Sequence, residues 1–214
     1  MNSLFEFDKS FDSVIIGTDE AGRGPVAGGV FASAVYFNNT NNELIEELSL
    51  LNDSKKLSKK KREHLYPIIF RNTINTTVCV EVDEIEKNNI LNSSLLAMKL
   101  ACEDVIRKAQ LKNYLVLVDG NKLIKNFDGN QQFIIKGDAK SASVAAASIL
   151  AKCTRDKYMK ELDKEFPQYM WGKNAGYLTK EHIKAIEEYG ICKYHRKSFL
   201  KKLQARQLSL LEDK

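Results

Sequence analysis

The 214-residue chain has few prolines and no closely spaced cysteines. Its three prolines and eleven glycines are too few for a collagen-like or low-complexity chain. None of its four cysteines occurs in C-x-x-C spacing, which argues against a zinc knot or a thioredoxin-type redox pair. No apolar run approaches the roughly 18 residues that span a bilayer, and the start, MNSLFEFDKSFDS, does not look like an export signal. We therefore expect a cytoplasmic protein with no membrane contact, whose cysteines are reduced and mostly buried.

The composition is that of a globular protein with 43% apolar and 29% charged residues. The net charge of +5 is small, but the positive charge is clustered. Residues 55–62 (KKLSKKKR) hold six basic residues in eight, and residues 191–206 hold six more with no acid among them. A solvated helix face explains one such run, whereas two in a small chain favour a phosphate-binding surface.

Hydrophobic patterning predicts strands alternating with helices. The expected strands are residues 13–17, 28–37, 76–82, 114–118 and 132–135, and the expected helices are residues 58–70, 92–110, 141–159 and 179–189. The first three strands favour an antiparallel meander. The order predicts an α/β catalytic core over residues 1–160, with a mixed central sheet flanked by helices, then a small helical extension over residues 161–206.

Acidic residues follow two of these strands. Asp19 and Glu20 come directly after the first strand, and Asp119 follows the strand at residues 114–118. Taken singly, each is more simply a turn or cap residue. If the two strands are neighbours, however, the three carboxylates meet at one edge and repel each other unless a cation neutralises them. Mg²⁺ and Mn²⁺ prefer oxygen ligands, and carboxylate-held ions of this kind hydrolyse phosphodiesters.

Several segments together resemble bacterial ribonuclease HII. They are GTDEAGRGPVAGG from Gly17, DSKKLS from Asp53, VDG from Val118, KGDAKSASVAAASILAKCTRD from Lys136, GYLT from Gly176 and YGICKYHRKSF from Tyr189. The resemblance runs from about Ser13 to Phe199. The related ribonuclease HIII carries an additional N-terminal domain, and only 12 residues precede Ser13, which favours type HII.

The resemblance implies a ribonuclease H-like fold and a metal-dependent endonuclease using Mn²⁺ or Mg²⁺. Its expected reactions are hydrolysis of the RNA strand in RNA/DNA hybrids and incision 5′ to a single ribonucleotide embedded in duplex DNA, leaving a 5′-phosphate. Such an enzyme acts in ribonucleotide and RNA primer removal during DNA repair and replication. A non-catalytic protein, or a nuclease of the same fold with another specificity, is the alternative. We expect a monomer.

The resemblance also assigns roles to individual residues. By matching positions, the catalytic and metal-binding carboxylates are Asp19, Glu20, Asp119 and Asp156. Helical spacing places Asp156 on one face with Lys152 and Ile149, which is compatible with that role. Asp138, just before the helix expected at residue 141, competes for it, and we expect Asp138 to be supporting or structural.

Substrate contacts follow from the same match. Gly22, Arg23 and Gly24 are expected to read the ribose 2′-hydroxyl through backbone groups, and Tyr177 to contact the ribonucleotide at the RNA–DNA junction. The expected phosphate contacts are Lys55, Lys56, Lys193, Arg196 and Lys197. For the histidines, we expect a hydrogen-bonded structural role for His195 and surface positions for His64 and His182.

The tail, residues 207–214, lies beyond these motifs. Its peptide QLSLL, from Gln207 to Leu211, resembles the short segment with which bacterial repair proteins bind the sliding clamp. A terminal peptide with apolar anchors suits groove binding. The simpler alternative is that these leucines finish a C-terminal helix that packs on the domain.

Overall fold

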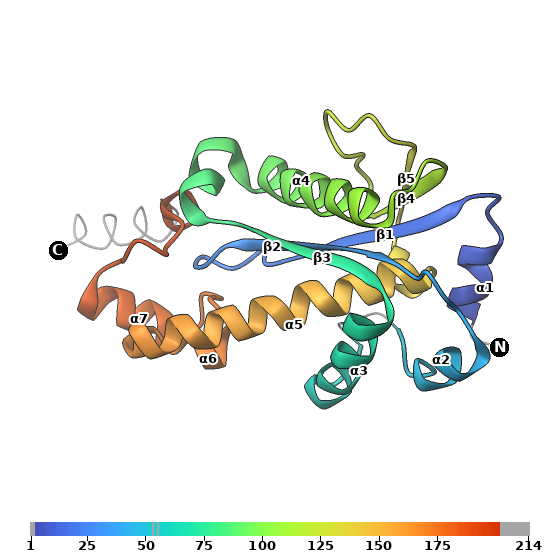
Figure 1. The fold of residues 1–214 in the computed structure, drawn as a ribbon. Coiled ribbons are helices and arrows are strands. Elements are labelled where there is room, and N and C mark those ends of the chain that lie inside the picture. Colours follow the sequence, from blue (N-terminus) through green and yellow to red (C-terminus); the bar gives the residue numbers. More distant parts are fainter. Residues whose placement is uncertain (1–2, 53, 55, 202–214) are drawn as a thin grey trace.

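The computed structural model describes residues 3–52, 54 and 56–201 of the chain, which form a three-layered α/β structure (Figure 1). The strands are β1 (Val14–Ala21), β2 (Val30–Tyr36), β3 (Ile74–Val80), β4 (Tyr114–Asp119) and β5 (Gln131–Ile134). The helices are α1 (Ser3–Lys9), α2 (Asn42–Glu47), α3 (Lys59–Asn72), α4 (Val82–Ala109), α5 (Ala142–Glu165), α6 (Trp171–Asn174) and α7 (Lys180–Tyr189), with 3₁₀ turns η1 (Gly137–Ala139) and η2 (Pro167–Tyr169). None of the helices described is long and apolar enough to cross a membrane.

The five strands form one mixed sheet in the order β3-β2-β1-β4-β5. Strands β1, β2 and β3 pair antiparallel, which confirms the expected meander. Strands β4 and β5 continue the sheet in parallel with β1, so β1 and β4 are neighbours as the placement of the acids required. In this register Thr18 lies opposite Val118, which brings the next residues, Asp19 and Asp119, to the same edge.

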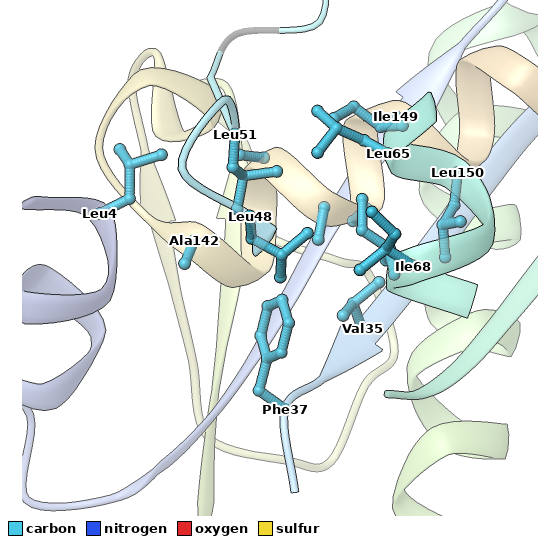
Figure 2. Packing of buried hydrophobic residues seen from close by; sticks show 14 of the residues in the cluster. Leu4, Val35, Phe37, Leu48, Leu51, Leu65, Ile68, Ala142, Ile149 and Leu150 are labelled. Atoms are coloured by element: carbon cyan, nitrogen blue, oxygen red, sulfur yellow. The ribbon is translucent and has the colours of Figure 1, made fainter. Parts of the chain in front are cut away.

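Helices cover both faces of the sheet. Helix α4 lies on one face and α5 on the other, with α3 and α2 beside α5 (Figure 1). On the α5 side, Figure 2 shows Val35 and Phe37 of the β2 region meeting Leu48, Leu65 and Ile68, side chains brought in by the α2–α3 region. These apolar contacts supply the main stabilising free energy and fix the position of α5 relative to the sheet.

Helix α5 approaches β1 unusually closely. A Cβ atom placed on Gly17 would lie 2.1 Å from the carbonyl carbon of Ser143 on α5. The first turns of α5 are rich in small buried residues, including Ala145, Ala146 and Ala147. Small residues on both elements remove the bulk that would hold them apart, so the backbone of α5 reaches the strand that carries Asp19.

Several elements differ from the sequence-based expectation. Strand β1 runs to Ala21, so Asp19 and Glu20 lie inside it rather than after it. Helices α1 and α2 were not expected, and α4 begins at Val82, ten residues early, with a break at Asn89, whose side chain caps the second half. Ser58, Ser141 and Thr179 cap their helices with side-chain oxygens.

The C-terminal helices pack against the far end of α5. Tyr169, Trp171 and Ala185 form a small apolar cluster with Met159 and Leu162 of α5. Helix α5 continues to Glu165, so the boundary expected after residue 160 falls inside an unbroken helix. The segment that follows α5 is therefore anchored on the same helix that packs against the core sheet.

Substitution of Gly17 by alanine is expected to destabilise the protein strongly. The new methyl group overlaps backbone atoms of α5 that cannot move without displacing the helix, so we expect a loss of about 3 kcal/mol or more in unfolding free energy, measured by chemical denaturation. Gly24→Ala is the control, since a Cβ at position 24 would lie at an ordinary van der Waals distance, 3.4 Å, from Tyr177 Cε1. Equal stabilities of the two variants would contradict the close approach.

Candidate active site

Three carboxylates come together at one end of β1 and β4. Asp19 is buried, with 5% of its surface exposed. Burial raises the pKa of Asp19 well above its ordinary value, and the negative charges of Glu20 and Asp119 raise it further. A hydrogen bond from Ser148 of α5 and one from the backbone N–H of Glu20, at 2.7 Å from Asp19 Oδ1, partly offset that penalty. The predicted meeting of these three acids is therefore present in the fold.

Asp119 is oriented by the turn that follows β5. The backbone N–H of Gly137 donates to Asp119 Oδ1 at 2.7 Å. The next residue, Asp138, lies in the same 3₁₀ turn and is buried, with 6% exposed. Asp138 therefore directly follows the residue that binds Asp119, in the turn that leads into α5.

Asp156 lies elsewhere, and the geometry does not support it as the fourth carboxylate. It is eight residues beyond Ser148 on α5, which is about 12 Å further along the helix axis. Its Oδ1 accepts from Lys152 Nζ at 2.7 Å. It lines a pocket of about 360 Å³ between α3 and α5, with Arg62 and Lys157 among its neighbours. Helical spacing placed Asp156 on a shared face correctly, but it could not say how far along α5 the acids lie.

The donor set fits a hard divalent cation. Within the described ranges, no group of three or more His, Cys, Asp or Glu side chains lies in an arrangement that could hold a metal ion. Even so, Asp19, Glu20 and Asp119 offer only oxygen donors, which Mg²⁺ and Mn²⁺ prefer. Because the mutual repulsion that raises the pKa of Asp19 is removed by a bound cation, these residues are suited to hold one.

The glycine-rich loop after β1 meets the segment that carries Tyr177. A Cβ atom on Gly24 would lie 3.4 Å from ring carbon Cε1 of Tyr177. The N–H of Val26 donates to the carbonyl of Gly176 at 2.9 Å, which joins the two segments. Tyr177 is 51% exposed, and Arg23 pairs with Glu20 at 3.2 Å. The fold thus places the predicted ribose-reading residues beside one another and beside the carboxylates.

Of the predicted phosphate contacts, three are surface residues and one is not. Lys56, Lys193 and Lys197 are exposed, whereas Lys55 lies outside the described residues. Arg196 is fully buried, with 0% exposed, and its guanidinium donates to the carbonyls of Arg23, Pro25 and Gly28. The prediction that Arg196 contacts phosphate directly is therefore wrong, because its side chain is buried and bonded to backbone carbonyls.

Two histidines form a buried hydrogen-bonded pair. His182 Nε2 lies 3.1 Å from His195 Nε2, and the N–H of Cys192 donates to His195 Nδ1. Since His182 Nδ1 faces the carbonyl of Tyr177 at 2.9 Å, it must carry a proton, and His195 Nε2 then donates to His182 Nε2. The structural role expected for His195 is confirmed. The surface position expected for His182 is wrong, since it is 0% exposed.

This combination of a mixed sheet, flanking helices and an acidic cluster at adjacent strand ends defines a ribonuclease H-like α/β protein. A solved ribonuclease H2 from Pyrococcus horikoshii is 24% identical, covers 90% of this chain and 97% of its own, and superposes with a TM-score of 0.66. A ribonuclease HII from Archaeoglobus fulgidus, solved in complex with PCNA, is 23% identical. The match covers 86% of this chain and 93% of the solved chain, with a TM-score of 0.68.

Sequence comparison identifies the family. A sequence model described as Ribonuclease HII matches residues 16–202. A ribonuclease HII from Fusobacterium nucleatum is 50% identical over 203 residues, covering 94% of this chain and 92% of its own. A ribonuclease HII from Pelagibacter ubique is 50% identical over 188 residues, covering 87% of this chain and 95% of its own. The chain belongs to the ribonuclease HII family and is a ribonuclease H endonuclease.

The buried histidine pair predicts a loss of stability in mild acid. Burial lowers the pKa of His195 to about 4, below the ordinary 6.5 that it regains on unfolding. Below pH 6.5 the unfolded chain therefore binds more protons, so the unfolding free energy falls as the pH falls toward 4. At pH 5, His195 alone lowers the unfolding free energy by about 2 kcal/mol relative to pH 7.

Unfolding free energies at pH 7 and pH 5 test this expectation. His195→Gln is expected to remove about 2 kcal/mol of the pH dependence of the unfolding free energy. Identical pH dependence in wild type and His195→Gln would contradict the assignment.

Proposed function

We propose that this endonuclease cleaves the RNA strand of RNA/DNA hybrids and nicks DNA duplexes 5′ to single embedded ribonucleotides, leaving 5′-phosphates. The observation that carries the proposal is the contact between Gly24 and Tyr177 beside the Asp19–Asp119 cluster. A hydrolytic centre and a surface suited to ribose recognition thus adjoin one another. Removal of ribonucleotides and RNA primers during DNA repair and replication is the corresponding role.

Asp19, Glu20 and Asp119 are the residues that hold Mn²⁺ or Mg²⁺ in this proposal. A divalent ion held there would supply Lewis-acid chemistry, namely activation of water and stabilisation of charge on the phosphate. Among the solved neighbours, a ribonuclease HIII described as being in complex with Mn²⁺ has 17% sequence identity, covers 89% of this chain and 67% of its own, and has a TM-score of 0.66. The N–H of Gly137 and the hydroxyl of Ser148 orient the carboxylates.

Asp138 takes the role of fourth acidic group in place of Asp156. It directly follows Gly137, whose N–H binds Asp119, and it is buried. Asp156, by contrast, lies about two helical turns beyond Ser148 and is paired with Lys152. These observations favour Asp138 over Asp156 as the carboxylate that completes the charge a cation requires.

Substrate binding combines ribose reading with charge attraction. Backbone groups of residues 22–24 and the exposed ring of Tyr177 contact the ribonucleotide, since the 2′-hydroxyl is the group that separates RNA from DNA. The exposed Lys56, Lys193 and Lys197 bind phosphates and position the duplex. Because these contacts ignore base identity, cleavage is independent of sequence.

Asp119→Asn is expected to abolish cleavage without unfolding the protein. The asparagine keeps an oxygen that accepts from Gly137 but removes one charge beside Asp19, so the melting temperature stays equal or rises. We expect at least a hundredfold loss in the nicking rate of a labelled duplex carrying one ribonucleotide. Chelation of metal by EDTA should also stop the wild-type enzyme.

The matched control is Asp128→Asn, at an exposed position between β4 and β5. It should nick at the wild-type rate. Full activity of Asp119→Asn, or wild-type nicking in EDTA, would overturn the proposed centre. Failure of the wild type to nick the single ribonucleotide while still cutting a long hybrid would instead remove only the junction specificity.

We further propose that the tail peptide from Gln207 to Leu211 binds the sliding clamp. The peptide lies outside the described residues, so the proposal is supported by its sequence and by the Archaeoglobus fulgidus neighbour, which was solved in complex with PCNA. Removal of residues 207–214 should abolish clamp pull-down and leave nicking of short duplexes unchanged. Pull-down that survives the truncation would contradict it.

A further inference from the structure

Two arginine side chains are buried beneath the glycine-rich loop. Arg155 of α5 is 1% exposed and Arg196 is 0% exposed. Neither takes part in an ion pair among the described residues. Both instead donate to backbone carbonyls, which is an unusual use of a buried charge and calls for a functional reason.

Arg196 holds the front of the loop. Its Nη1 donates to the carbonyls of Arg23 at 3.2 Å and Pro25 at 2.9 Å. Its Nε and Nη2 both donate to the carbonyl of Gly28, at 2.9 and 2.6 Å. Its backbone N–H donates to the carbonyl of Val26 at 2.8 Å. One residue therefore fixes four carbonyls between positions 23 and 28.

Arg155 ties the back of the loop to the Tyr177 segment. Its Nη2 and Nε donate to the carbonyls of Ala27 at 3.0 Å and Gly29 at 3.2 Å. Its Nη1 donates at 3.0 Å to the carbonyl of Ala175, two residues before Tyr177. The guanidinium also lies directly under Gly22, where a Cβ atom would come within 2.2 Å of Nε.

We infer that Arg155 and Arg196 are positioning residues that set the discrimination between ribose and deoxyribose, by fixing the peptide between Arg23 and Gly24 against Tyr177. In a trans peptide the C=O and N–H point in opposite directions. Because Arg196 draws the carbonyl of Arg23 inward, the N–H of Gly24 points away from it, in the exposed part of the loop that contacts Tyr177. This inference rests on the proposed function.

Arginine is the residue type that this arrangement requires. Its rigid planar fork reaches several carbonyls at once, whereas a lysine ammonium is a single point on a flexible stem. Burial, together with the charge of Arg155, lowers the pKa of Arg196 to about 9, so it is still charged at neutral pH. A charged donor on the carbonyl also polarises the peptide and strengthens its N–H as a donor.

The test measures binding of a non-cleaved complex, with Ca²⁺ replacing the catalytic ion. Fluorescence anisotropy gives Kd for a duplex with one ribonucleotide and for the same duplex entirely in DNA. For Arg196→Lys and Arg155→Lys, we expect the ratio of the two Kd values to fall at least fivefold, with Kd for DNA alone within twofold of wild type. Arg107→Lys, at a 75% exposed side chain on α4, is the matched control and keeps the wild-type ratio.

A second measurement reports on the loop without substrate. The chain has eleven glycines, so labelling glycine alone with ¹⁵N gives a simple amide spectrum, in which Gly24→Ala identifies the Gly24 signal. Arg196→Lys should move that signal while signals of distant glycines such as Gly120 and Gly190 stay in place, which shows that the protein is folded. Arg107→Lys should move none of them.

The outcomes separate this inference from its alternatives. If Arg196 were a direct phosphate contact, both Kd values would weaken together and the dependence on salt would become shallower. An unchanged Kd ratio and an unmoved Gly24 signal in folded Arg196→Lys would overturn the positioning role. A wild type that binds both duplexes equally would instead overturn the proposed ribose specificity itself.

Discussion

Helix α5 packs so closely on β1 that position 17 has room only for glycine, and the parts of the site take their places from that contact. Near its start, α5 brings Ser148 to the buried Asp19. Two turns later the same helix carries Arg155 under the glycine-rich loop. One rigid element therefore sets the spacing between the acidic cluster and the glycine-rich loop, so a shift of α5 would disturb both at once.

The site contains buried charged groups that lower the stability of the fold, in contrast to the apolar core. A buried aspartate beside two other acids, and two buried guanidiniums on backbone carbonyls, all oppose folding unless something offsets them. The interaction that compensates for burial differs between the guanidiniums and the acids. The guanidiniums are satisfied inside the protein by loop carbonyls, whereas the acids remain in mutual repulsion that a cation relieves. The loop is thus fixed by interactions within the protein, while the acidic cluster has oxygen donors of the kind that divalent cations prefer.

Sequence motifs located the chemistry well but could not supply distances. Asp19 and Asp119 were found because each closes an apolar strand, and a parallel register joins them. Asp156 was placed with them by the family resemblance, with a compatible helical face as support, but a face gives direction without position along the axis. Arg196 and His182 were assigned to the surface because basic and polar residues usually lie there; only packing shows that carbonyls and a second histidine surround them.

What the sequence by itself determined is the alternation of strands and helices, the family, and the identity of the first three acids, since local pattern and residue chemistry decide these. The tertiary structure decided which carbonyls the buried arginines hold, that the turn before α5 binds Asp119, and how close Gly24 lies to Tyr177. These depend on contacts between residues as many as 173 positions apart, which no local pattern encodes.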